Sequence, residues 1–383
     1  MELPLSYIEI SKQNILHNFS VIRAFIHPDT KIACVIKANA YGHGQNEVAK
    51  ILEPVADYFQ VDDLAELRLL RTVSNKPTLV FGYVAKQELE EALTLHGILT
   101  IYDTERLQQI DTISKKVGTH AKVHIKIDSF LGRQGLLIED IEPFLRVLKP
   151  YRYIDVDGIY AHFANIEDTS DFSHAQKQID GLDKALDICK TCGYTNIKHH
   201  ISATSGILVY EKDTGKNHIV RLGIGLYGMW PSEKIQKKYQ RSTFTFKPAL
   251  RWVTHIAQVK ILPKNYSIGY GLTYITKAIT KIAIVPQGYS DGYDRGLSNN
   301  GVVLINGIRC NILGRITMNM FMVDVTNIKN VKAEDEVVLL GSQQQACMSA
   351  EEIANQINTI NYEVTTRISP LLPRITVPHF PNS

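Results

Sequence analysis

A single lysine closes an apolar run near the start of the sequence, in the stretch CVIKANAYGHG at positions 34–44. A lysine amine attacks a carbonyl carbon only in its uncharged form, which an apolar pocket or a nearby cation favours. The neighbours Val35, Ile36 and Ala38 are apolar. This arrangement suggests an imine between Lys37 and a carbonyl compound, although a lysine at the end of a strand is more often simply solvated.

Other polar residues also follow short apolar runs in the first part of the sequence. These residues are Lys126, Asp128, His162, Ser205, Arg221 and Gly223. Each has an ordinary explanation by itself, because a lone lysine or histidine is usually solvated or part of a core. If the runs are strands of one barrel, however, all of these residues meet Lys37 at the same end. The pattern therefore predicts a site assembled from several strands.

The elements that must position these residues are short apolar runs separated by amphipathic stretches. The runs are 31–39, 58–61, 78–83, 99–103, 122–128, 157–163, 197–203 and 219–226. Between them, apolar residues recur at steps of three and four, which predicts helices, and Asp62 is expected to cap one of these helices. Repeated strand–helix units predict an α/β fold, with a closed (β/α)8 barrel rather than an open sheet.

After about residue 235 the pattern changes to strands with few helices between them. Asn306-Gly307, between VVLI and IRCNIL, predicts a type I′ hairpin, and one helix is expected at 349–358. We therefore predict two domains, a barrel at 1–235 and a mainly antiparallel β domain at 236–383. A first strand at about 6–10 could pack with the second domain.

Composition excludes several classes of protein. The 383 residues carry a net charge of +3 without blocks of like charge, which gives no electrostatic case for nucleic acid or an anionic membrane as partner. No signal-peptide pattern and no apolar run of ~18 residues is found. Five scattered cysteines suit the reducing cytoplasm. Cys189 and Cys192 form a CxxC that no second ligand pair completes, so no metal site is predicted.

Residues 223–228 read GIGLYG, which matches the spacing of a dinucleotide-binding loop. That loop must follow a strand and open a helix, whereas these glycines lie within the predicted strand and are followed by Trp230 and Pro231. We therefore reject a nucleotide-binding domain. The same glycines suit a phosphate site after the eighth strand of a barrel, as the phosphate of pyridoxal phosphate would require.

These motifs resemble those of the alanine racemase family of fold-type III enzymes that depend on pyridoxal 5′-phosphate. VIKANAYGHG is similar to the family's cofactor-attachment signature. Further similar blocks follow in the family's order: KID…GRQG (126–135), GIYAHF (158–163), RLGIGLYG (221–228), GYGLTY (269–274), PQGYSDGYDR (286–295) and GRITMNM (314–320). The resemblance implies a cytoplasmic isomerase that interconverts L- and D-alanine.

The resemblance also implies roles for individual residues. Lys37 would hold the cofactor and act as the base on one face of the substrate, and Tyr270 from the partner subunit of a homodimer would act on the other face. The implied cofactor-binding residues are Lys37, Tyr41, His162, Ser205, Arg221, Gly223 and Ile224. The implied substrate-binding residues are Arg133, Met318 and Tyr289. The supporting residues are Lys126, which is carbamylated in some members, Asn319 and Pro370.

The implied roles agree with the chemistry that racemisation requires. A proton must leave one face of a planar carbon and arrive on the other, so two bases are needed. Arg221 would meet the pyridine nitrogen of the cofactor, and an arginine cannot readily give up its proton there. The ring is then a weaker electron sink, which should disfavour transamination.

Four places depart from the family pattern. Residues 129–131 read Ser-Phe-Leu instead of Thr-Gly-Met, Thr204 replaces an asparagine, and Asn319 replaces an aspartate. Pro370 replaces a tyrosine that braces Tyr41, and a proline offers no donor from its side chain or its backbone nitrogen. A looser pocket that also admits serine is one expectation. The alternative is that a nearby residue fills the gap and alanine remains the main substrate.

Two other functions of the same fold type are alternatives to a racemase. A decarboxylase of basic amino acids or diaminopimelate would supply a cysteine from the partner subunit in place of Tyr270, within a motif that the sequence lacks. A non-enzymatic protein that binds pyridoxal phosphate would lack the C-terminal β domain. Both alternatives fit the sequence less well than a racemase.

Overall fold

The computed structural model describes residues 4–212, 215–240 and 242–381. The chain forms two compact units, each of which collects segments that are distant in the sequence. We call them the barrel unit (Leu16–Ala38 and Val48–Phe246) and the β unit (Met1–Ile15, Asn39–Glu47 and Lys247–Ser383). The segment after Lys37 therefore belongs to the β unit, although the lysine itself belongs to the barrel unit.

The barrel unit contains a parallel sheet in the order β8-β7-β6-β5-β4-β3-β2-β9. Its strands are β2 (Lys31–Val35), β3 (Tyr58–Val61), β4 (Thr78–Val80), β5 (Gly97–Ile101), β6 (Ala121–Lys126), β7 (Ile154–Tyr160), β8 (Lys198–His200) and β9 (Ile219–Leu222). Two backbone hydrogen bonds join the ends of β8 and β9, from His218 N to His199 O (3.1 Å) and from Arg221 N to Ser202 O (3.0 Å). The predicted (β/α)8 barrel is confirmed, with short strands.

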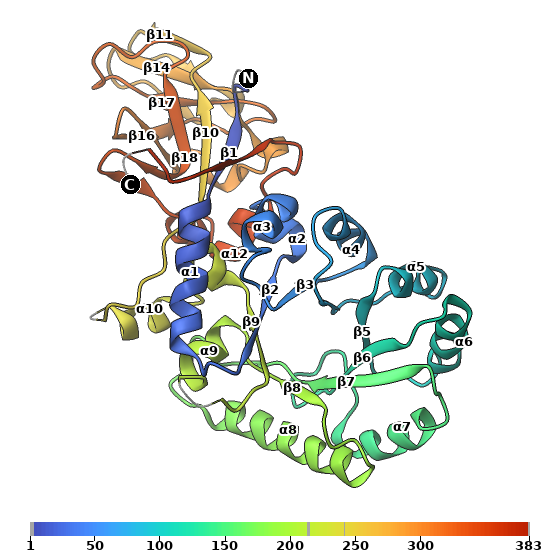
Figure 1. The fold of residues 1–383 in the computed structure, drawn as a ribbon. Helices are drawn as coiled ribbons and strands as arrows, with labels where there is room; N and C mark the ends of the chain where they lie inside the picture. Colours follow the sequence, from blue (N-terminus) through green and yellow to red (C-terminus); the bar gives the residue numbers. More distant parts are fainter. Residues whose placement is uncertain (1–3, 213–214, 241, 382–383) are drawn as a thin grey trace. The chain divides into compact units, whose positions relative to one another are not determined.

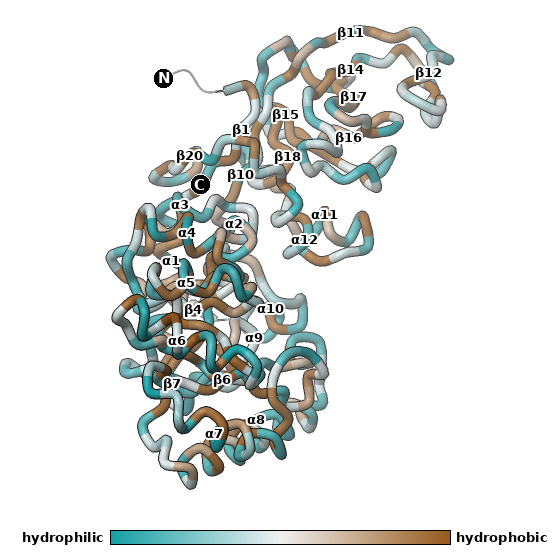
Figure 2. Tube along the Cα trace, turned by 90° about the vertical axis from the view of Figure 1, so that its right-hand side faces the viewer, coloured by the Kyte–Doolittle hydropathy of each residue, from teal (hydrophilic) through white to brown (hydrophobic). Residues whose placement is uncertain are grey.

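Helices surround these strands (Figure 1). They are α1 (Lys12–Phe25), α3 (Gln45–Leu52), α4 (Leu64–Arg71), α5 (Leu89–Thr94), α6 (Leu107–Val117), α7 (Ile141–Leu148), α8 (Ser173–Thr191), α9 (Thr204–Tyr210) and α10 (Glu233–Tyr239). In α7 the residues Ile141, Phe144, Leu145 and Leu148 are buried, which is one stripe at helical spacing. Brown and teal stretches accordingly alternate along the helices in Figure 2.

The cap of α4 lies one residue later than the sequence suggested. Asp63 is the N-cap, and its Oδ1 accepts a hydrogen bond from Glu66 N at 2.9 Å. The expectation that Asp62 caps this helix is wrong. The carboxylate of Asp62 is therefore available for another contact, which belongs to the candidate site.

The β unit contains a sheet in the order β11-β14-β17-β16-β15-β18-β10-β1-β20, with β19 beside β18 and a separate pair β12-β13. The strands are β1 (Tyr7–Ser11), β10 (Leu250–His255), β11 (Gln258–Leu262), β12 (Ser267–Ile268), β13 (Tyr274–Ile275), β14 (Thr280–Val285), β15 (Val302–Ile305), β16 (Ile308–Leu313), β17 (Phe321–Asp324), β18 (Glu336–Gln343), β19 (Ala346–Met348) and β20 (Arg374–Val377). All pairs are antiparallel except β1 with β20.

Local signals in the sequence account for the connections of this unit. Asn306 and Gly307 have φ angles of 51° and 74° between β15 and β16, so the type I′ hairpin is confirmed. The predicted helix forms α11 (Ala350–Gln356), whose N-cap Ser349 accepts from Glu352 N. A short helix that the sequence did not indicate follows it, α12 (Asn361–Thr366).

Candidate active site

Lys37 lies just beyond the C-terminal end of β2, and Asp62 lies directly after β3. The Lys37 Nζ donates a hydrogen bond to Asp62 Oδ1 at 3.1 Å. Both side chains are partly exposed, 40% for the lysine and 49% for the aspartate, so solvent weakens this ion pair. The barrel therefore presents a reachable amine at the end where barrels place their chemistry.

The backbone after Lys37 winds in the left-handed sense. Ala38, Asn39, Ala40 and Tyr41 have φ angles of 52° to 53°, although none of them is glycine. The left-handed conformation costs each non-glycine residue about 1–2 kcal/mol of conformational free energy. Strained backbone of this kind is found mostly at functional sites. Within the barrel unit the carboxylate of Glu66 accepts from Ala38 N at 2.6 Å, so the first residue of the turn is held by a charged acceptor.

Arg221, in β9, is only 2% exposed and is surrounded by acceptors. One terminal nitrogen lies 2.5 Å from His200 Nδ1. The other lies 2.9 Å from His162 Nδ1 and donates to the carbonyl oxygens of Ala161 at 3.1 Å and Ile201 at 2.8 Å. The guanidinium is thus held in one orientation inside the barrel.

His162 follows β7, and the positive charges of four side chains of the barrel unit act on its imidazole. Burial, followed by the positive charges of Arg221, Lys126, Arg133 and Lys37, holds the pKa of His162 well below its usual value. Lys37 follows β2, Lys126 ends β6 and His162 follows β7, so these residues lie at the same C-terminal end of the parallel sheet. His162 is therefore a neutral imidazole at physiological pH.

Lys126, the last residue of β6, is 2% exposed. Burial first, and then the charges of Arg221 and Arg133, lower the pKa of Lys126 to about 7. The Nζ donates to Ile127 O at 3.1 Å and lies 4.8 Å from the centre of the Tyr160 ring. Near neutral pH this amine is therefore partly uncharged and able to act as a nucleophile.

Arg133 lies on an exposed loop that winds around Asp128. The carboxylate of Asp128 accepts from the backbone N–H groups of Leu131 and Gly132, both at 2.9 Å, and from that of Arg133 at 3.1 Å. Three donors on one carboxylate fix the loop at its base. Asp128 thereby positions the backbone of Arg133. From the sequence, Asp128 is only a polar residue at the end of a predicted strand.

The predicted phosphate residues lie on two neighbouring turns. Ser205 is in the first turn of α9, and Ile224 begins the 3₁₀ turn η3 (Ile224–Tyr227); both are buried. Thr204 Oγ1 accepts from Gly223 N at 3.2 Å and from Gly225 N at 3.3 Å. Thr204, which departs from the family pattern, therefore ties the two turns together through its hydroxyl.

Tyr41 belongs to the β unit and packs against a tyrosine of α12. The ring centroids of Tyr41 and Tyr362 are 6.0 Å apart, with the planes inclined by 48°. Next to them, Arg374 donates from Nε and Nη2 to Gly42 O at 3.2 and 3.0 Å. Pro370 is exposed. An aromatic neighbour of Tyr41 therefore exists, although it comes from another position than the one expected.

The other predicted residues of the β unit are strongly exposed. Tyr270 is 74% exposed and begins η4 (Tyr270–Leu272), between Gly269 and Gly271, which both have positive φ. Tyr289 and Met318 are 44% and 55% exposed. These exposed side chains form part of the surface of the β unit.

Two loops of this surface lie side by side. Met318 O accepts from the N and Oγ of Ser290 at 3.1 and 2.8 Å, and Asn319 Nδ2 donates to Ser290 Oγ at 2.9 Å. Tyr289 N donates to Thr317 O at 3.1 Å. The amide side chain of Asn319 thus fixes one loop to the other.

Several residues around the site were not found from the sequence. They are the ion-pair partner Asp62, the backbone acceptor Glu66, the imidazole His200 and the ring neighbour Tyr362. Only His200 left a signal, because two adjacent histidines in the apolar run IKHHISA are unusual.

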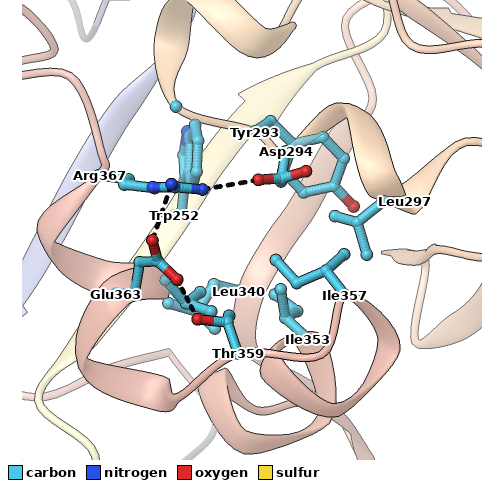
Figure 3. A pocket seen from close by; sticks show the side chains of 12 residues that line it. Trp252, Tyr293, Asp294, Leu297, Leu340, Ile353, Ile357, Thr359, Glu363 and Arg367 are labelled. Carbon is cyan, nitrogen blue, oxygen red and sulfur yellow. Dashed lines mark hydrogen bonds and ion pairs between the residues drawn. The ribbon is translucent and has the colours of Figure 1, made fainter.

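A small cavity of about 20 Å³ lies in the β unit, and none of the predicted site residues lines it. It is lined mainly by apolar side chains, with an Asp294–Arg367 ion pair of 2.9 Å at its edge (Figure 3). The hydroxyl of Tyr293 is buried here and has no hydrogen-bond partner among the described residues. The volume admits about one water molecule, which is too little for a substrate.

Neither a metal site nor a membrane-spanning helix is found in the part of the chain that the structure describes. Among these residues, no group of three or more His, Cys, Asp or Glu side chains is arranged to hold a metal ion. Cys189 is buried in α8, Cys192 follows that helix, and both thiols are free. No helix in these ranges has the length and apolar character needed to span a membrane.

Comparison with known proteins gives full-length matches. The family model described as "Alanine racemase, N-terminal domain" matches residues 10–231, and "Alanine racemase, C-terminal domain" matches residues 249–376. An alanine racemase of Methanococcus maripaludis is 38% identical over 374 residues, which covers 96% of this chain and 98% of the relative.

Solved structures agree with these matches. The alanine racemase of Clostridium difficile 630 superposes with a TM-score of 0.91 at 33% identity, over 98% of this chain and 97% of that one. The alanine racemase of Bacillus anthracis with bound L-Ala-P gives the same TM-score and identity, over 98% and 96% of the two chains.

Proposed function

The chain belongs to the alanine racemase family, and from this premise we propose how its residues divide the work. Its activity is the interconversion of L- and D-alanine with pyridoxal 5′-phosphate as cofactor. When bound, the cofactor withdraws electrons from the substrate Cα, so that the Cα proton becomes removable. The observation that carries the proposal is that Lys37 and His162 follow parallel strands at the same end of the barrel, with Arg221 2.9 Å from His162 Nδ1.

The donors in the barrel unit fit this cofactor. Arg221 is fixed by four acceptors and can offer a guanidinium N–H to a pyridine nitrogen, with His162 beside it. Ser205 and the backbone of Gly223 and Ile224, together with Tyr41, would hold the phosphate. Since the N–H of Gly223 already donates to Thr204, the phosphate and Thr204 would share this donor.

Lys37 and Tyr270 are the two bases in this proposal. Lys37 would move the proton at its Nζ on one face of the substrate, and Tyr270 at its Oη on the other. Asp62 Oδ1 accepts a hydrogen bond from Lys37 Nζ at 3.1 Å and so holds the amine at the end of the barrel. Arg133 and the backbone N–H of Met318 would bind the substrate carboxylate, and Tyr289 would line the entrance.

The second base comes, in our proposal, from the partner subunit of a homodimer. Tyr270 is three-quarters exposed in the chain, among other exposed apolar side chains, which include Leu272, Ile275, Met318 and Met320. A surface of this kind is favoured by association, because covering it removes apolar area from water. A twofold dimer would then hold two sites, each with Lys37 of one subunit and Tyr270 of the other.

Mixed dimers test both parts of this proposal. Lys37→Ala and Tyr270→Phe should each lose racemase activity, and mixing the two unfolded variants before refolding should restore about a quarter of the wild-type value. Half of the refolded dimers are mixed, and one of their two sites is intact. No recovery, with normal dimer formation, would mean that the two residues act within one chain. Refolded wild-type protein is the control for yield.

Lys126 is proposed to be carbamylated and to orient Arg133. The supporting observation is its lowered pKa of about 7, because only an uncharged amine adds to carbon dioxide. Carbon-13 NMR in labelled bicarbonate should show one carbamate signal that Lys126→Met abolishes. A spectrum unchanged by this substitution would contradict the proposal.

Alanine is the main substrate in our proposal, with serine a minor one. The contact between the Tyr41 and Tyr362 rings supports the alternative in which another residue compensates for the tyrosine missing at Pro370. A strong preference for serine in kcat/KM would contradict this. We also place the protein in the cytoplasm, which is supported by its five free cysteines.

A further inference from the structure

A chain of hydrogen bonds runs through the barrel interior from Arg221 to Asp157, in the middle of β7, and to Lys198, the first residue of β8. The guanidinium lies 2.5 Å from His200 Nδ1, and His200 Nε2 lies 2.9 Å from His124 Nδ1. His124 Nε2 lies 3.0 Å from Asp157 Oδ2. The second carboxylate oxygen of Asp157 accepts from Lys198 Nζ at 2.5 Å. Arg221 is thus connected to an ion pair that plays no part in the proposed mechanism.

The chemistry of the two ends determines where each proton lies. Arg221 can only donate, so His200 Nδ1 must be an acceptor and the proton must lie on His200 Nε2. His124 Nδ1 then accepts from His200, and His124 Nε2 donates to the carboxylate of Asp157. Both imidazoles are consequently neutral and carry their proton on Nε2.

Packing keeps the two imidazoles in place. His200 is fully buried, and its ring stacks on Tyr160, with centroids 4.9 Å apart and planes inclined by 7°. The ring of Phe81 stacks on that of Tyr160, with centroids 4.4 Å apart, and on that of His200, with centroids 5.9 Å apart. His124 is 1% exposed and faces Gly158 on the neighbouring strand, where a Cβ atom would lie 2.7 Å from the imidazole. The rings therefore have no room to turn over.

We propose that Asp157 and Lys198 set the direction of this hydrogen-bond chain, so that it always presents an acceptor to Arg221. They act through His124 and His200 and touch neither cofactor nor substrate, which makes them positioning residues. The consequence for the cofactor rests on the proposed role of Arg221. The direction of the chain itself does not depend on that role.

Lys198 makes the proposal testable, because it competes for one oxygen of residue 157. A carboxylate offers an acceptor to both Lys198 and His124. The amide in Asp157→Asn has one oxygen and one NH2 group, and the ammonium of Lys198 can donate a hydrogen bond only to the oxygen. The NH2 group must then face His124 Nε2, which turns this nitrogen into an acceptor. Each proton in the chain moves to Nδ1, and His200 presents a donor to Arg221.

Removal of Lys198 should undo this reversal. In the double variant with Asp157→Asn and Lys198→Met, no other described side chain donates a hydrogen bond to the amide oxygen, so the oxygen can face His124 again. Lys198→Met by itself leaves the carboxylate in place and keeps the native direction. The single and double variants therefore form a set in which the second substitution repairs the first.

Nitrogen-15 NMR of histidine-labelled protein identifies which ring nitrogen carries the proton. We expect Nε2–H for His124 and His200 in the wild type, in Lys198→Met and in the double variant, and Nδ1–H or a charged ring in Asp157→Asn. Retention of Nε2–H in Asp157→Asn would overturn the proposal, and so would a double variant that stays reversed. If Asp157→Asn does not fold, we still expect the double variant to fold. A double variant that does not fold, although Lys198→Met folds, would count against the proposal.

The affinity for pyridoxal 5′-phosphate, measured by absorbance titration, separates this proposal from the role of Arg221. Two facing donors would displace the guanidinium, so we expect about 10- to 100-fold weaker binding in Asp157→Asn, which corresponds to one lost charged hydrogen bond. The double variant should bind within about threefold of the wild type. If Asp157→Asn reverses the tautomers but binds the cofactor with unchanged affinity, the proposal about the direction of the chain stands. The proposed contact between Arg221 and the cofactor would then be refuted.

Discussion

Replacement of Lys126 by methionine should change how the stability of the protein depends on pH. The amine is 2% exposed, and its pKa is lowered to about 7, chiefly by burial. As the pH falls from 10.5, the unfolded chain takes up this proton before the folded chain does. The folded state therefore loses stability down to about pH 7 and loses no more below it. At about 1.4 kcal/mol per pH unit, the loss reaches about 5 kcal/mol at most.

Lys126→Met has no buried amine and should escape this loss. The free energy of unfolding is to be measured by denaturant titration in buffer free of carbon dioxide. As the pH falls from 10 to 7, we expect the free energy of unfolding of the variant to rise relative to that of the wild type. Lys122→Met, on the exposed face of the same strand, is the matched control and should follow the wild type. A constant difference between Lys126→Met and the wild type across this range would refute the reasoning. An equal slope in the control would refute it as well.

Two further substitutions test the β unit. Tyr362→Ala removes the ring that packs on Tyr41 and should raise kcat/KM for serine relative to alanine. The expected change is about tenfold if the contact contributes about 1.4 kcal/mol. Tyr362→Phe keeps the ring and should keep the wild-type ratio. An unchanged ratio in Tyr362→Ala would exclude this role. Tyr293→Phe removes a buried hydroxyl that has no partner among the described residues and should raise the free energy of unfolding by about 1 kcal/mol, as measured by denaturant titration. A loss of stability would show that the hydroxyl has a partner in solution, such as a water molecule in the adjoining cavity.

Much of the barrel could be predicted because its strands are apolar runs that end at polar residues. The prediction erred at the run 31–39, because β2 ends at Val35 and the chain then turns left-handed from Ala38 to Tyr41. Propensity and hydrophobic pattern do not indicate this conformation for alanine or tyrosine. It depends on acceptors such as Glu66, which is distant in the sequence.

Residues that act through long-range contacts were missed for the same reason. His200 and His124 lie inside strands, where a polar side chain in an apolar run looks like an irregularity until its partner is known. Tyr362 lies on α12, whose sequence NYEVTT contains β-branched residues that weaken the helical signal. The hairpin at Asn306-Gly307, by contrast, is determined by two adjacent residues and was predicted in full.

The central claim is that Lys37 and Tyr270 exchange the Cα proton of alanine on opposite faces. The most direct test is to incubate the cofactor-loaded protein with L-alanine in D2O and to follow both enantiomers by chiral chromatography and mass spectrometry. We predict that D-alanine forms with deuterium at Cα, and that Tyr270→Phe abolishes this product. Release of carbon dioxide, or D-alanine formation undiminished in Tyr270→Phe, would contradict the account.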